Sequence, residues 1–111
     1  MNAKEFVTEL LEGAALSQPD QNLLAKLATE YGVRLPADDA AAAPVQVQNR
    51  FSGDTVSTTP LVAALVAFIY AVNTDSAPIT YRGKALPVSL YDRARYLVLK
   101  LDNRAYSALI D

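Results

Sequence analysis

The chain has 111 residues, of which 51% are hydrophobic and 20% are charged, and its formal net charge is −2. Such a chain is typical of a single globular domain rather than a disordered one, and its charge gives no general attraction to nucleic acid or to an anionic membrane. Because it contains neither cysteine nor histidine, disulfides, Cys–His or Ser–His catalysis and the usual zinc sites are excluded.

The amino-terminal part of the chain predicts two helices joined by a short connection. Residues 3–12 carry apolar side chains on one face and charged side chains on the other, which is the periodicity of an amphipathic helix. A second helix over 17–31 has a clearer start, because Ser17 can cap the first turn and Pro19 suits a position that has no amide partner. Gly32 predicts the end of this helix.

The next segment, residues 33–50, has few large apolar side chains, and we expect it to be flexible or extended, as a linker or an arm. Valine and glutamine alternate over 45–48, so a short strand is the alternative interpretation. A compact turn at 49–54 follows and holds one aromatic residue, Phe51.

The most distinctive segment is an uncharged stretch from Thr55 to Thr74 with a strongly apolar centre. Thr59 and Pro60 provide a hydroxyl cap and a first-turn proline, so we expect a helix over about 60–72. A helix that is apolar on every side must be surrounded by its own chain, by a second copy or by a partner. Its apolar run rises only ~18 Å, against ~30 Å of hydrocarbon in a bilayer, so we expect no membrane span. The amino terminus does not read as a secretory signal, and we expect a cytoplasmic protein.

One side of this central helix carries small residues at every fourth position. Ala63, Ala67 and Ala71 would let a neighbouring helix approach closely. Two interpretations stay open for this ridge. It can pack inside one subunit, or it can form a seam between two copies and make the protein a homo-oligomer.

The carboxy-terminal part predicts two further helices after a turn-rich segment. Residues 76–88 contain two prolines and a glycine, and we expect either a small hairpin near 79–86 or a loop. An apolar stripe predicts a fourth helix over about 88–101. Asp102 can cap a last short helix over 103–110.

These elements together predict a mainly α fold. Four to five helices would pack around the central apolar helix at about 60–72, with one small β-hairpin near 79–86. The whole chain, 1–111, would be a single helical domain interrupted only by the flexible or extended segment.

Two parts of the chain have the composition of a surface that binds a protein partner. The outer face of the fourth helix, opposite its apolar stripe, carries Arg95, Tyr96 and Leu99, and arginine, tyrosine and large apolar groups are typical of interface centres. Arg50 and Phe51 in the compact turn complete the candidate partner-binding residues. The alternative for Leu99 is burial beneath the last helix.

An enzyme is not expected. Asp38 and Asp39 are adjacent in an alanine-rich loop, and such neighbours lack the shielded, unequal environments of an acid–base pair. The chain has no glycine-rich phosphate loop and no dinucleotide fingerprint. We therefore expect no catalytic residues, no cofactor and no metal site.

Nucleic-acid binding is the alternative function, because the charge is unevenly distributed. Residues 1–75 hold nine acids and four bases (−5), whereas residues 76–111 hold three acids and six bases (+3). Tyrosines interleave with these bases, and such a pattern can grip phosphate while stacking a base. A solvated helix face that complements the acidic half explains the same residues. The candidate nucleic-acid-binding residues are Arg93, Arg95, Lys100 and Arg104.

Short motifs in the second half of the chain add a resemblance. They are Asn49–Gly53 before the central helix, Tyr91–Leu97 in the fourth helix and Ala105–Asp111 at the end. In these motifs the chain resembles small uncharacterised proteins encoded by tailed bacteriophages. The resemblance implies a viral origin and a place in the host cytoplasm or the virion, and it assigns no binding residue. The expected function is thus a small non-enzymatic interaction protein, acting on a host or viral protein or forming part of a virion.

Overall fold

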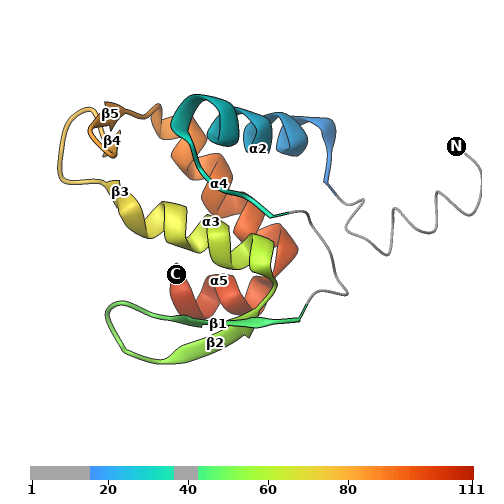
Figure 1. Ribbon diagram of the computed structural model, residues 1–111. Helices are drawn as coiled ribbons and strands as arrows, with labels where there is room; N and C mark the ends of the chain where they lie inside the picture. Colours follow the sequence, from blue (N-terminus) through green and yellow to red (C-terminus); the bar gives the residue numbers. More distant parts are fainter. Residues whose placement is uncertain (1–15, 37–42) are drawn as a thin grey trace, which may run out of the picture.

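The computed structural model describes residues 16–36 and 43–111 (Figure 1). The helix predicted at 3–12 lies outside the described residues, as does part of the segment expected to be flexible or extended. The helices of the described ranges are α2 (Gln18–Tyr31), α3 (Pro60–Ala71), α4 (Val88–Leu101) and α5 (Asn103–Leu109). The strands are β1 (Val45–Gln48), β2 (Thr55–Thr58), β3 (Val72–Asn73), β4 (Thr80–Tyr81) and β5 (Lys84–Ala85).

The mainly α fold predicted from the sequence is wrong, because two small antiparallel sheets accompany the helices. One sheet pairs β1 with β2 around the turn at 49–54, with Val45 opposite Thr58 and Gln48 opposite Thr55. The other sheet has three strands in the order β3, β4, β5. The protein is therefore a small mixed α/β globule rather than a helical domain.

The first sheet replaces the linker or arm that was expected over 45–48, and the alternative of a short strand is confirmed. Val47 stands opposite Val56 in the ladder, and both side chains pack against the core. Each strand taken alone has too little apolar surface to indicate burial. The cross-strand pair supplies the missing apolar surface, because opposite residues on one face of a hairpin pack together.

The second sheet contains the hairpin expected near 79–86. Arg82 and Gly83 both have positive φ, 53° and 82°, as a two-residue turn of this handedness requires. Val72, expected in the central helix, instead begins β3 and pairs with Tyr81. The helix ends one residue early because the hairpin supplies hydrogen-bond partners for an extended backbone at this point.

The core is built around α3, as the apolar run predicts. Thr59 accepts a hydrogen bond from the backbone N–H of Val62, and Pro60 occupies the first turn. The helix α4 contacts α2, α3 and α5 and buries its apolar stripe between them (Figure 1). Within the described ranges, none of the helices is both long and apolar enough to span a membrane. The largest fully buried side chains include Leu27, Leu61, Leu65, Phe68, Leu86 and Leu97.

The predicted ends of α2 and the predicted start of α5 are confirmed. The hydroxyl of Ser17 accepts from the backbone N–H of Asp20, and Gly32 ends α2 in the left-handed region with φ 67°. Asp102 accepts from the backbone N–H of Ala105 in the first turn of α5. The helix α5 that begins at this cap contacts β2 of the hairpin, beside which the candidate site lies.

Candidate functional site

The turn at 49–54, at the tip of the β1–β2 hairpin, presents Phe51 to solvent with 82% of its surface exposed. The turn is held by the side chain of Asn49, whose Oδ1 accepts from the backbone N–H groups of Phe51 at 2.7 Å and Ser52 at 3.0 Å. The backbone N–H of Gly53, at φ 81°, donates to the carbonyl of Asn49 at 2.9 Å. The aromatic ring is thus exposed on a turn whose backbone is well constrained.

Asn49 also fixes where the turn lies. Its Nδ2 donates to the carbonyl of Ala108 at 2.7 Å, near the end of α5. Carbonyls in the last turn of a helix have no partner within the helix, so they are available to such a donor. In Figure 1 the hairpin runs directly alongside α5, in agreement with the contacts between α5 and β2. The hairpin tip is therefore docked rather than free.

Arg50 joins the turn to the end of α3. Its guanidinium carbon lies 4.9 Å from the ring centroid of Phe51 and 4.6 Å from that of Tyr70, and one N–H group donates to the carbonyl of Tyr70. The hydroxyl of Tyr70 donates to the carbonyl of Leu109 at 2.6 Å. Arg50 and Tyr70 thus connect three elements, and the guanidinium is held between the Phe51 and Tyr70 side chains.

These groups surround a hollow of about 290 Å³, which we call the hairpin-tip hollow. The side chains of Ile69 and Leu109 are buried and form apolar lining, and Arg95 approaches from α4. Among residues 16–36 and 43–111, no carboxylate side chain belongs to the lining. The hollow combines aromatic and aliphatic walls with two positive charges. The further aromatic and apolar lining residues are Phe51, Tyr70, Tyr91 and Ile110.

The structure brings together three of the five predicted partner-binding residues, Arg50, Phe51 and Arg95, around this hollow. The other two lie elsewhere on α4. Tyr96 is exposed, with the Lys100 ammonium 5.7 Å from its ring centroid, and Leu99 is partly buried.

Sequence reasoning missed the other lining residues, because they come from α3, the residue after β3, α4 and the end of α5, and only the fold brings these segments together. Tyr70 had one usable signal: it is the only hydroxyl-bearing side chain in the apolar run at 61–72. Tyr91 precedes Arg95 by four residues, so the two share one face of α4. The Arg95 guanidinium carbon lies 5.6 Å from the Tyr91 ring centroid.

The four predicted nucleic-acid-binding residues do not line one common cavity. Arg95 lines the hairpin-tip hollow, whereas Arg93 lines a separate groove between α2 and α4. The Lys100 ammonium forms an ion pair of 2.6 Å with Asp20. Arg104 lines a third cavity, which also contains the Asp102 carboxylate.

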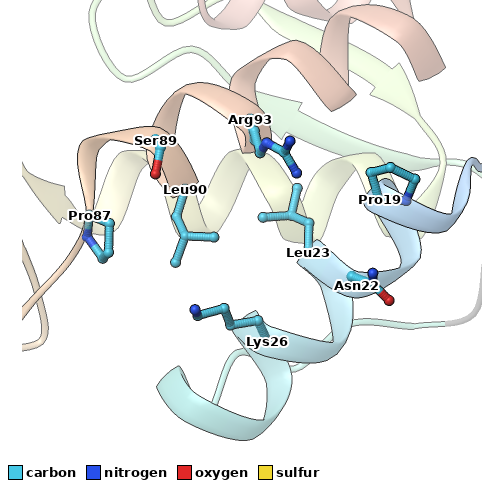
Figure 2. A pocket seen from close by; sticks show the side chains of 8 residues that line it. All are labelled: Pro19, Asn22, Leu23, Lys26, Pro87, Ser89, Leu90 and Arg93. Carbon is cyan, nitrogen blue, oxygen red and sulfur yellow. The ribbon is translucent and has the colours of Figure 1, made fainter.

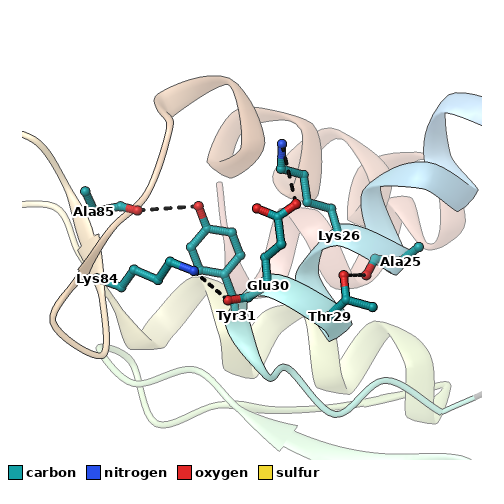
Figure 3. A network of polar contacts seen from close by, with 7 residues as sticks. All are labelled: Ala25, Lys26, Thr29, Glu30, Tyr31, Lys84 and Ala85. Atoms are coloured by element: carbon teal, nitrogen blue, oxygen red, sulfur yellow. Dashed lines mark hydrogen bonds and ion pairs between the residues drawn. The ribbon is translucent and has the colours of Figure 1, made fainter.

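The groove between α2 and α4 has a volume of about 450 Å³ and is larger than the hairpin-tip hollow. In Figure 2 the side chains of Leu23 and Leu90 lie between those of Lys26 and Arg93. Lys26 also belongs to the polar network of Figure 3, where its ammonium lies 3.9 Å from the Glu30 carboxylate. The groove lacks an exposed aromatic side chain, so it has no obvious anchor for a partner.

The same network ties α2 to the second sheet. The Lys84 ammonium donates to the carbonyl of Glu30 at 2.8 Å, and the hydroxyl of Tyr31 donates to the carbonyl of Ala85 at 3.4 Å (Figure 3). The Lys84 ammonium also lies 4.6 Å from the ring centroid of Tyr31. These contacts have a structural role, because they hold the end of α2 against β5.

The alanine ridge of α3 is covered only at one end. Ala63 is partly buried, whereas Ala67 and Ala71 are exposed. Packing against the other described residues therefore accounts for only part of the ridge. Self-association through Ala63, Ala67 and Ala71 stays a prediction.

Among the described residues, no group of three or more acidic side chains gathers in a way that would hold a metal ion. Comparison of the chain with protein-family models, with curated proteins and with solved structures gave no match. The resemblance to small phage proteins stays a prediction from the sequence motifs.

Proposed function

We propose that this protein is a small non-enzymatic interaction factor that binds a short segment of another protein at the hairpin-tip hollow. The observation that carries the proposal is the exposure of Phe51 on a constrained turn. A large apolar side chain held in water forgoes the stabilisation that burial would give it. Binding a partner segment would recover this stabilisation, and the turn keeps the ring ready for it.

The composition of the hollow supports this proposal. Arginine and aromatic side chains dominate the residues that contribute most to protein–protein affinity. Arg50 is already ordered by Tyr70, and the backbone around Phe51 is already fixed by Asn49. Groups that are ordered before binding lose less conformational entropy when a partner arrives.

Nucleic-acid binding has less support than protein binding. Its candidate bases lie in different cavities, and one of them, Lys100, is engaged by Asp20. Proteins that bind nucleic acid usually present a continuous basic patch or stripe. If the resemblance to phage proteins reflects common origin, the bound segment belongs to a host or viral protein.

A displayed library of random peptides tests the proposal. Selection on the immobilised full chain should enrich peptides whose binding is lost in Phe51→Ser. The matched control is Val88→Ser, which removes another exposed apolar side chain at the start of α4, outside the hollow. Peptides that bind both variants as well as the unmodified protein, or no enrichment at all, would refute the proposal.

A further inference from the structure

We infer, building on the proposed function, that the segment bound at the hairpin-tip hollow is acidic. An Asp or Glu carboxylate would lie at Arg95, and a neighbouring apolar side chain of the segment would lie against the exposed ring of Phe51. The inference names the chemical class of the partner segment, which the proposed function leaves open.

Arg95 is the group that points to a carboxylate. It forms neither a hydrogen bond nor an ion pair with another described residue, and its guanidinium lies at the hollow beside the Tyr91 ring. A guanidinium has five N–H donors in a planar fork, and this fork matches the two oxygens of a carboxylate. The aromatic ring supports the cation without using these in-plane donors.

Arg50 adds a second positive charge to the same hollow. One of its N–H groups is used by the Tyr70 carbonyl, and the remaining donors are held in place by the two neighbouring rings. Since no acidic side chain of the described residues lines the hollow, none of them neutralises these charges from within it. The local charge is thus positive on a chain whose net charge is −2. A complementary partner segment carries negative charge.

The size and lining of the hollow explain why the acidic segment should also carry an apolar side chain. Its volume of about 290 Å³ lies just below the ~300 Å³ lower limit of ligand pockets, which suits one or two peptide side chains. Phe51 provides the exposed apolar wall, with 82% of its surface accessible, whereas Ile69 and Leu109 expose only 4% and 3%. A phosphate backbone would match the two arginines and leave the Phe51 ring without an apolar partner.

The test selects the same random peptide library on three full-length proteins: the unmodified chain, Arg95→Glu and Arg93→Glu. Arg93 is the matched control, because it lies on the same helix and lines the groove on the α2 side. Peptides selected by the unmodified chain should contain more Asp and Glu than the input library. Their affinity, measured by fluorescence anisotropy, should fall roughly tenfold or more in Arg95→Glu and stay unchanged in Arg93→Glu. Selection on Arg95→Glu should enrich Lys and Arg instead.

Arg95→Lys keeps the charge and removes the fork, so its affinity should lie between those of the unmodified chain and Arg95→Glu. Arg95→Lys therefore tests carboxylate binding at Arg95 even where Arg95→Glu fails to fold. Circular dichroism would reveal such a failure. Affinity should also weaken as salt is added, because charge attraction is screened.

The outcomes separate this inference from the proposed function. Phe51-dependent peptides without an acidic excess, or with affinity unaffected at Arg95, would overturn the inference and leave the proposed function standing. The absence of any Phe51-dependent peptide would overturn both. Phe51-dependent binding of a pool of single-stranded oligonucleotides in place of peptides would also overturn both, and would assign the hollow to nucleic acid.

Discussion

The hydroxyl of Thr58 donates a hydrogen bond of 2.7 Å to Oδ2 of Asp102, which joins the end of β2 to the start of α5. Thr58 is only 4% exposed, so its hydroxyl depends on this partner. The other oxygen, Oδ1, accepts from the backbone N–H of Ala105 at 3.0 Å. One carboxylate thus satisfies a buried hydroxyl and a helix amide. It also positions α5, which carries Leu109 and the carbonyl of Ala108 in the candidate site.

Replacement of Asp102 should therefore be costly. Asp102→Ala removes a helix cap and leaves the buried hydroxyl of Thr58 without an acceptor. We expect it to lower the free energy of unfolding by about 2–4 kcal/mol, measured by urea denaturation. Asp92→Ala is the control, because Asp92 is an exposed aspartate in the middle of α4, and its effect should stay within about 0.5 kcal/mol. Equal effects for the two variants would show that Asp102 does not hold α5.

Asn49 has two separable roles, which two substitutions distinguish. Asn49→Ala removes both the acceptor for the turn amides and the donor to Ala108, and we expect a loss of about 1–3 kcal/mol in unfolding free energy. Asn49→Asp keeps the acceptor for the turn amides but turns a carboxylate oxygen toward the Ala108 carbonyl, so its loss in unfolding free energy reports on docking to α5. Amide hydrogen exchange measured by NMR reports on the turn directly. The N–H groups of Phe51 and Ser52 should exchange faster in Asn49→Ala and stay protected in Asn49→Asp.

The control for this pair is Ser52→Ala. Ser52 Oγ accepts from the backbone N–H of Asp54 at 3.2 Å, in an exposed part of the same turn. Removal of the Ser52 hydroxyl should make the Asp54 amide exchange faster and leave the Phe51 amide protected. If Asn49→Asp exposes the Phe51 amide as much as Asn49→Ala does, the turn is held by its docking on α5 and not by its own hydrogen bonds.

Truncation of the two phenylalanines Phe68 and Phe51 should affect the unfolding free energy to very different extents. Phe68 is buried and packs on Tyr81 with ring centroids 4.9 Å apart, so Phe68→Ala should cost about 3–5 kcal/mol. Phe51→Ser removes an exposed ring and should change the unfolding free energy by less than about 0.5 kcal/mol. Thermal and urea denaturation measure both. A loss of several kcal/mol in Phe51→Ser would mean that the ring stabilises the fold, and its exposure would no longer indicate a partner.

The helix ends were predictable because their signals are local. Ser17, Thr59 with Pro60, and Asp102 each act on amides within three residues, and the structure confirms all three caps. A cap of this kind depends little on the rest of the chain, so residue type and spacing identify it.

The sheets and the hollow depend on contacts between distant segments, and their local signals are weak. Val47 of β1 packs against the core only where Val56 of β2 stands opposite it, and both side chains are partly buried. The early end of α3 depends on pairing with Tyr81, which local helix signals do not register. The candidate residues Arg50, Phe51 and Arg95 were found by composition. Their convergence was not predictable, because Tyr70 and Leu109 assemble the hollow from other helices.

The ion pair between Lys100 and Asp20 should contribute modestly and in a salt-dependent way. The two groups lie 2.6 Å apart and join the end of α4 to the start of α2, with side-chain exposures of 35% and 14%. We expect Lys100→Met to lower the unfolding free energy by up to about 1 kcal/mol at low salt, and by less at high salt. Asp20→Asn should cost about 0.3–1 kcal/mol more, because Asp20 also lies at the positive end of the α2 dipole.

Lys26→Met is the matched control for this ion pair. Lys26 lies 3.9 Å from Glu30, and about half of each side chain is exposed, so the Coulomb attraction is weaker and better screened. Its removal should leave the unfolding free energy unchanged within error at either salt concentration. If Lys100→Met behaves like Lys26→Met at low salt, the ion pair does not contribute to the contact between α2 and α4, and apolar packing holds the two helices together. If the effect of Lys100→Met is instead insensitive to salt, the loss does not come from the screened attraction between Lys100 and Asp20.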